Sequence, residues 1–129
     1  MTPAPKRLQV RFARHTSRLK QLVRFYRDGL GLSELGRFQN HDGYDGVFLD
    51  LPGTGAHLEF TSGGPHPPPV AHEETLLVLY VEDEKTIAET CIRIDAQPIE
   101  PANPYWRRHG VTVLDPDGFA VVLVSSEPA

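Results

Sequence analysis

The chain has 129 residues, with 13 Lys and Arg against 17 Asp and Glu, and a formal net charge of −4. That length supports one domain with its own core, and the negative charge offers no field that would attract nucleic acid or an anionic membrane. A single cysteine excludes an intrachain disulfide, and no apolar run approaches the roughly 18 residues that cross a bilayer. The sequence therefore predicts a cytoplasmic protein whose partners are small molecules or other proteins.

The first half of the chain predicts one helix and four strands. Residues 7–17, RLQVRFARHTS, alternate apolar and polar side chains, which indicates a strand with one apolar face. Residues 18–32 then place apolar side chains at helical spacing before Gly29 ends the pattern, and we expect this helix to cover the apolar face. The turn sequences NHDG and PGTG separate three further predicted strands, near residues 32–39, 44–51 and 56–62.

The same order begins again after a linker rich in Gly and Pro at residues 63–72. TLLVLYV predicts an apolar strand, and Asp83 can cap a helix after it. We then expect a weak strand at AQPIE, a loop at PANPYWRR, and two strands joined by the turn DPDG. The chain thus divides into two modules, residues 7–62 and 73–126, each with the order strand, helix, three strands.

This doubled order, with FYRDGLGL at the end of the first helix, HLEFT in the fourth strand and DPDG before the last, resembles the vicinal oxygen chelate superfamily. That superfamily contains glyoxalase I, extradiol dioxygenases, and the bleomycin and fosfomycin resistance proteins. The resemblance runs from about Leu8 to Ser125 and implies an α+β fold. Two βαβββ modules would form a half-open curled sheet, with the helices outside and a cavity on the concave face. The modules that pair can belong to one chain or to two chains of a homodimer.

The resemblance also implies a divalent metal, but this chain departs from the pattern of its ligands. The four ligand positions fall on Arg11, Glu59, Leu76 and Val122. A guanidinium and two aliphatic side chains cannot ligate a divalent ion, so one ligand in four remains. We therefore expect a protein without the superfamily's metal site that binds a small organic molecule. A metal-dependent lyase or dioxygenase of the glyoxalase type is the alternative.

Strand parity predicts a polar spot in the cavity. Successive side chains alternate between the two faces of a strand, so His57 and Glu59 share the concave side. Arg11 and His15 of the first strand point there too. If the first and fourth strands are neighbours, as the resemblance implies, Arg11 and Glu59 can pair, since either charge buried alone would be costly.

Glu59 has three interpretations at this point. It forms a structural ion pair with Arg11, or it contacts a polar group of a ligand, or it binds a metal together with His57 or His15. In an enzyme Glu59 would be the general base and Arg11 would stabilise an oxyanion. A binding protein of the bleomycin resistance type would need no catalytic group, and the sequence leaves these two classes open.

The second module is expected to supply an apolar half of the cavity, because its concave strand positions are aliphatic or aromatic. Tyr105 and Trp106, in the predicted loop, would form a wall or lid over an apolar ligand. Packing of Trp106 at the end of the barrel or at a dimer interface is the alternative. The predicted ligand-binding residues are His15, His57, Leu76, Val78, Tyr80, Tyr105, Trp106 and Val122.

Overall fold

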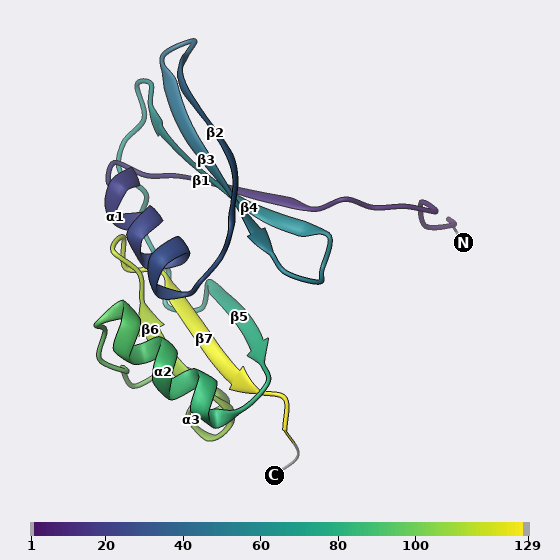
Figure 1. Cartoon of the computed structure of the whole chain (residues 1–129), viewed down its shortest axis with the longest axis vertical. Coiled ribbons are helices and arrows are strands. Elements are labelled where there is room, and N and C mark those ends of the chain that lie inside the picture. The colour runs from purple at the N-terminus through teal and green to yellow at the C-terminus, as the bar shows by residue number, and fades with distance from the viewer. Residues whose placement is uncertain (1, 128–129) are drawn as a thin grey trace.

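The computed structural model describes residues 2–127 and contains two small mixed sheets with helices packed against them (Figure 1). The elements are β1 (Arg11–His15), α1 (Leu19–Val23), the π-helical turn η1 (Arg24–Gly29), β2 (Glu34–His41), β3 (Tyr44–Leu51), β4 (Ala56–Gly63), β5 (Leu76–Val81), α2 (Glu84–Ile94), α3 (Pro104–His109), β6 (Val111–Leu114) and β7 (Ala120–Ser125). Strands follow the order β1-β4-β3-β2 in one sheet and β5-β7-β6 in the other. Within the described residues, no helix is long and apolar enough to cross a membrane.

The core of the first module lies between α1–η1 and one face of its sheet. Val47 of β3 is paired with Phe60 of β4, and Leu49 with Leu58, so all four side chains point to the helix side. All four are buried, as are the residues that α1 and η1 turn toward them, Leu22, Val23, Phe25 and Tyr26. The alternation of the strands and the apolar side of α1–η1 therefore specify the same core.

The helix does not cover β1, which corrects the expectation drawn from its apolar face. Val10 and Phe12 are 54 % and 59 % exposed. Helix α1 contacts β4, further into the sheet, whereas β1 lies at the sheet edge. The apolar side chains of β1 therefore line the seam between the two modules instead of the core of the first.

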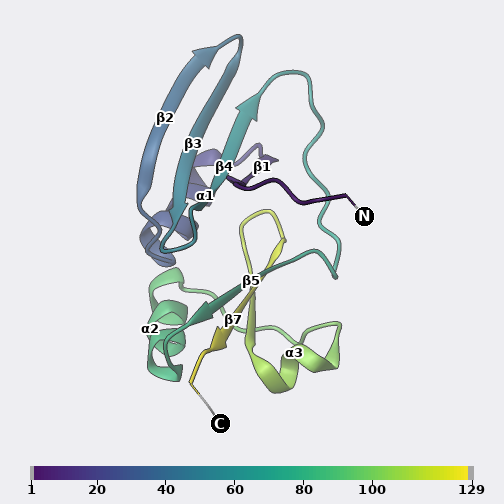
Figure 2. The ribbon, with the colours of Figure 1, turned by 90° about the vertical axis from the view of Figure 1, so that its right-hand side faces the viewer.

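The second module is a three-layer unit (Figure 2). Asp83 caps α2, because its Oδ1 accepts the backbone N–H of Thr86 at 2.8 Å. Helix α2 covers one face of the sheet and α3 lies on the other. The expected loop at PANPYWRR was wrong: Asn103 caps α3 by accepting from Tyr105 N at 3.0 Å, and Pro104 suits the first helical turn. The expected strand at AQPIE is reduced to one bridge, from Ile99 to Thr112.

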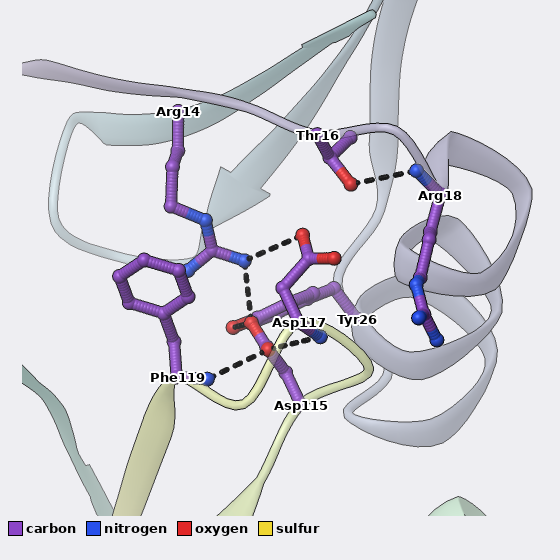
Figure 3. Close-up of polar contacts among 7 residues, drawn as sticks. All are labelled: Arg14, Thr16, Arg18, Tyr26, Asp115, Asp117 and Phe119. Atoms are coloured by element: carbon purple, nitrogen blue, oxygen red, sulfur yellow. Dashed lines mark hydrogen bonds and ion pairs between the residues drawn. The ribbon is translucent and has the colours of Figure 1, made fainter. Parts of the chain in front are cut away.

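A buried carboxylate joins the two modules (Figure 3). Asp115, in the turn before β7, has a fully buried side chain; its Oδ2 accepts from Arg14 Nη2 at 2.5 Å and from Tyr26 Oη at 2.7 Å. Its Oδ1 accepts the backbone N–H groups of Asp117 at 2.9 Å and Phe119 at 3.0 Å. Burial, and then the neighbouring Asp115 charge, raise the pKa of Tyr26 far above its usual range, so Tyr26 stays a neutral donor. Four donors therefore satisfy one buried charge.

Removing that charge should destabilise the whole chain. We expect Asp115→Asn to lower the free energy of unfolding by about 3 kcal/mol, because Arg14 loses the nearer of its two buried carboxylate partners, Asp117 being 3.7 Å away. Tyr26→Phe should cost less, about 1.5 kcal/mol, since it removes one hydrogen bond to a charged group. The exposed Asp42→Asn is the control and should change stability by less than about 0.5 kcal/mol. Urea unfolding measures all three, and equal stability of Asp115→Asn and the control would contradict the role of the carboxylate.

Candidate functional site

The predicted ion pair between Arg11 and Glu59 is present on the sheet face opposite α1. Strands β1 and β4 are parallel neighbours, with Arg11 beside His57 and Ala13 beside Glu59. Arg11 Nη1 lies 3.4 Å from Glu59 Oε1, and Arg11 Nε donates to His57 Nε2 at 3.2 Å. Phe48 of β3 completes the group, because the Arg11 guanidinium lies 5.2 Å from the centre of its ring. One cation therefore organises a carboxylate, an imidazole and an aromatic ring.

This polar group is open to solvent on one side. The Arg11 side chain is 56 % exposed, whereas that of Glu59 is 12 % exposed. An exposed pair at this separation contributes little to folding, because water screens the charges. The accessible guanidinium can still offer N–H groups to a ligand, and the sheltered carboxylate can still accept from one.

His15 belongs to a second cluster further along the same face. Its ring lies 5.0 Å from that of His66, centre to centre, and His66 Nε2 is 2.6 Å from Tyr44 Oη. His15 Nδ1 is buried and has no hydrogen-bond partner in the described part of the chain. Sequence reasoning missed this cluster, because His66 lies in the linker and its position depends on how the linker folds back.

The donors on this face do not fit the superfamily's metal. Among residues 2–127, no three His, Cys, Asp or Glu side chains lie close enough together to hold an ion. The guanidinium of Arg11 already occupies the position beside Glu59, where a second cation would be repelled. Leu76 and Val122, at two other ligand positions, have no lone pair to offer.

A hollow of about 370 Å³ lies in the second module, on the face that carries α3. Trp106, Leu76 and Ala120 form part of its wall, and Glu73 and Glu100 lie at the same hollow. Thr112 also lines it; this residue is only 3 % exposed, and its Oγ1 has no hydrogen-bond partner within residues 2–127. A buried hydroxyl without a partner is costly, so the hollow presents an unmet polar group on a wall that is largely apolar.

The other predicted ligand-binding residues have varied surroundings. Val122 is fully buried, and Gly110 at the end of α3 lies against it, so closely that a Cβ there would be 2.9 Å from the valine. Val78 is half-buried, and Tyr80 is 66 % exposed at the end of β5. Tyr105 meets the ring of Trp106 edge-on and lies tilted against the ring of His109, and it is not among the residues that line the hollow.

An apolar crevice of about 290 Å³ runs along the seam between the modules. Phe12, Phe60 and Phe119 line it, and Arg14 lies over the ring of Phe119 at 3.9 Å. Leu76 and Ala120 line both this crevice and the hollow beside Trp106, so the two spaces adjoin. Sequence reasoning missed the crevice, because it depends on how the modules meet.

Glu59→Gln should separate a structural role of the carboxylate from a functional one. We expect the free energy of unfolding to change by less than about 1 kcal/mol, because the partner Arg11 is exposed. We also expect the tag-free wild type and the variant to retain equally little Zn, Ni, Mn or Fe(II) after incubation and removal of unbound ion. Urea unfolding and elemental analysis measure the two. Near-stoichiometric metal that disappears in Glu59→Gln would contradict our assignment and support a metal-dependent enzyme.

Two family profiles match the chain: the YycE-like N-terminal domain over residues 10–61 and the YycE-like C-terminal domain over residues 74–125. The uncharacterized protein YycE of Bacillus subtilis is 42 % identical over 123 residues, which are 92 % of this chain and 88 % of that protein. The crystal structure of a YycE protein of unknown function from that organism has a TM-score of 0.85 at 41 % identity, covering 94 % of this chain and 91 % of its own.

More distant structures share the fold. Trypanothione-dependent glyoxalase I of Leishmania major has a TM-score of 0.70 at 21 % identity, over 93 % of this chain and 87 % of its own. TnmS3, an antibiotic-binding protein of Streptomyces sp. CB03234, has a TM-score of 0.67 at 21 % identity, over 96 % of this chain and 100 % of its own. The chain belongs to the YycE-like family, within the vicinal oxygen chelate superfamily of glyoxalases and antibiotic resistance proteins.

Proposed function

We propose that this protein binds a small, largely apolar organic molecule in the hollow beside Trp106. The observation that carries the proposal is the buried hydroxyl of Thr112, which has no partner among the described residues and lines an otherwise largely apolar wall. A ligand with one hydrogen-bonding group would satisfy that hydroxyl and would bury its apolar body against Leu76 and the indole. The volume, about 370 Å³, is in the range of small-molecule sites.

Charge narrows the class of ligand. Glu73 and Glu100 lie at the hollow, and Arg107 pairs with Glu100, which leaves Glu73 without an ion-pair partner within residues 2–127. An uncharged or cationic ring compound suits such a rim, and an anionic compound does not. The antibiotic-binding TnmS3 shares the fold, which supports sequestration as a function this architecture can perform.

An enzyme of the same fold is the second candidate, supported by the Arg11, His57 and Glu59 group. Glu59 would accept a proton from a bound substrate, and the exposed Arg11 guanidinium would stabilise the resulting oxyanion. No step in this scheme passes through a metal. Turnover that Glu59→Gln abolishes, while a substrate analogue still binds, would favour the enzyme. A stable complex without product would favour the binder.

The hollow can be tested through Trp106, the chain's single tryptophan. We expect uncharged or cationic aromatic compounds to change its fluorescence, and Thr112→Val to weaken the binding of such compounds about tenfold, equivalent to ~1.4 kcal/mol. The same variant should be more stable than the wild type by about 1 kcal/mol, because a methyl group replaces a buried hydroxyl without a partner.

Ile92→Ala is the control, because Ile92 is 78 % exposed on α2, on the other side of the sheet. It should leave both the fluorescence titration and the affinity unchanged. Binding that Thr112→Val leaves intact, combined with a loss of stability in that variant, would show that the hydroxyl has a partner in solution and would refute the proposed site.

We also propose that the protein forms a homodimer through the edge strands of its two sheets. Strands β1 and β5 are edges, and edge strands with exposed apolar side chains readily pair with another chain. Leu8 is 75 % exposed, Phe12 59 % and Tyr80 66 %. Exposed apolar side chains on unpaired strand edges are a feature of surfaces that pair with another chain.

Light scattering should give twice the 14.4 kDa mass of one chain. Phe12→Asp should shift the protein to the monomer, because a charge at the centre of the edge cannot be buried against a second apolar edge. Ile92→Asp adds the same charge at an exposed apolar position on α2 and should leave the dimer intact. A monomeric wild type at high micromolar concentration would exclude the homodimer.

A further inference from the structure

The first module has a hollow of its own, on the opposite side of its sheet from Arg11 and Glu59. It is a groove of about 730 Å³ between helix α1–η1 and strands β2 and β3. Four cations line it, three from the helix and one from β2: Lys20, Arg24, Arg27 and Arg37. Asp45 is the one carboxylate of its lining. The groove is therefore a positive region on a chain whose net charge is −4.

The spacing of the helix cations works against folding. Lys20 and Arg24 are four residues apart, and Arg27 follows three residues later, so the three charges lie along one side of the helix. Like charges at this spacing destabilise a helix. Neither Lys20 nor Arg24 has an ion-pair partner anywhere in residues 2–127. A bound anion would relieve this repulsion.

Two of the cations are held in place by one carboxylate. Glu34 Oε1 accepts from Arg27 Nη1 at 2.8 Å and from Arg37 Nη2 at 2.6 Å, and its Oε2 accepts from Arg37 Nε at 2.7 Å. These bonds, those from Arg37 first and then that from Arg27, lower the pKa of Glu34 to about 2. The carboxylate therefore stays charged at neutral pH. Asp28 accepts from Arg27 Nε at 2.9 Å.

Glu34 and Asp28 therefore orient Arg27 and Arg37 without neutralising the positive charge of the groove. Four cations outnumber the three nearby carboxylates of Asp28, Glu34 and Asp45. Arg27 and Arg37 each keep one guanidinium nitrogen that no carboxylate accepts from, Nη2 of Arg27 and Nη1 of Arg37, and these are left for a ligand. Guanidiniums held before the ligand arrives lose less entropy on binding.

The remaining polar groups of the groove are neutral hydrogen-bonding side chains, from Ser17, Gln21, Gln39 and Ser62. Arginine and lysine with hydroxyl and amide donors form the set that proteins use to bind phosphate. The volume exceeds that of one phosphate group, and the four cations are spread along the groove. The ligand therefore needs more than one anionic group and some organic volume.

We propose that this groove binds a small molecule that carries two or more linked phosphate groups. The groove lies in the first module, whereas the hollow beside Trp106 lies in the second. The two sites are therefore separate, and this proposal is independent of the function proposed for that hollow. A long nucleic acid is the less suitable ligand, because the rest of this acidic chain would repel a polyanion that extends beyond the groove.

Pyrophosphate and ATP are suitable probes. Their binding to the full chain can be measured by titration calorimetry at low ionic strength. We expect both to bind the wild type, to raise its melting temperature, and to bind more weakly as salt is added. Lys20→Ala/Arg24→Ala should weaken binding at least about tenfold, since two unpaired charges are lost. Both side chains are exposed, so this variant should fold as the wild type does.

Lys85→Ala/Arg108→Ala is the matched control, because it removes the same charge outside the groove. It should bind pyrophosphate as the wild type does, and ring compounds that bind beside Trp106 should not compete. Failure of pyrophosphate and ATP to bind the wild type at millimolar concentration would refute the proposal. Equal loss in the control variant would also refute it, because the effect would then reflect net charge alone. An RNA oligonucleotide that binds while pyrophosphate does not would point to a different partner.

Discussion

The bonds that Asp115 accepts from Arg14 and Tyr26 fix how the two modules meet. The carboxylate belongs to the turn before β7, whereas its donors come from β1 and η1 of the other module. The same side chain shapes its own turn by accepting two backbone N–H groups. A fully buried carboxylate must be satisfied on all sides, so neither module can rotate without breaking one of these bonds. The seam is therefore set by charge as well as by apolar packing.

This constraint divides the two faces of β1. Arg14 and Phe12 alternate with Arg11 and Ala13, so anchoring Arg14 to the second module turns Arg11 toward the opposite face. There the guanidinium meets Glu59, which is diagonally across from it on β4. The same alternation leaves Phe12 at the seam, where α1 is too far into the sheet to cover it. The ion pair and the exposed apolar edge have the same origin.

The periodicity of the sequence predicted the contacts that depend on only one or two neighbouring elements. The parity of HLEFT placed Glu59 opposite the helix, and a β1–β4 neighbourhood then brought Arg11 to it. The Arg14–Asp115 bond joins residues 101 positions apart, and no periodicity encodes that pairing. Helix α3 was missed for a local reason: Asn103 followed by Pro104 is also the signal of a helix start, but six residues are too few to show a period. The sequence placed Trp106 beside an apolar part of the cavity, but the shape of the hollow depends on α3 and could not be predicted without that helix.

The open face around Arg11 bears on the choice between an enzyme and a binder. Charge stabilisation in catalysis needs a site that excludes water, because a high dielectric weakens every interaction inside it. With Arg11 more than half exposed, one chain alone does not provide that exclusion. A second copy paired along β1 would cover the edge where Phe12 is exposed and would shelter the guanidinium beside it. Oligomeric state and chemistry are thus linked: a monomer favours a binder that uses the hollow beside Trp106, and a dimer through β1 makes Glu59 a credible base.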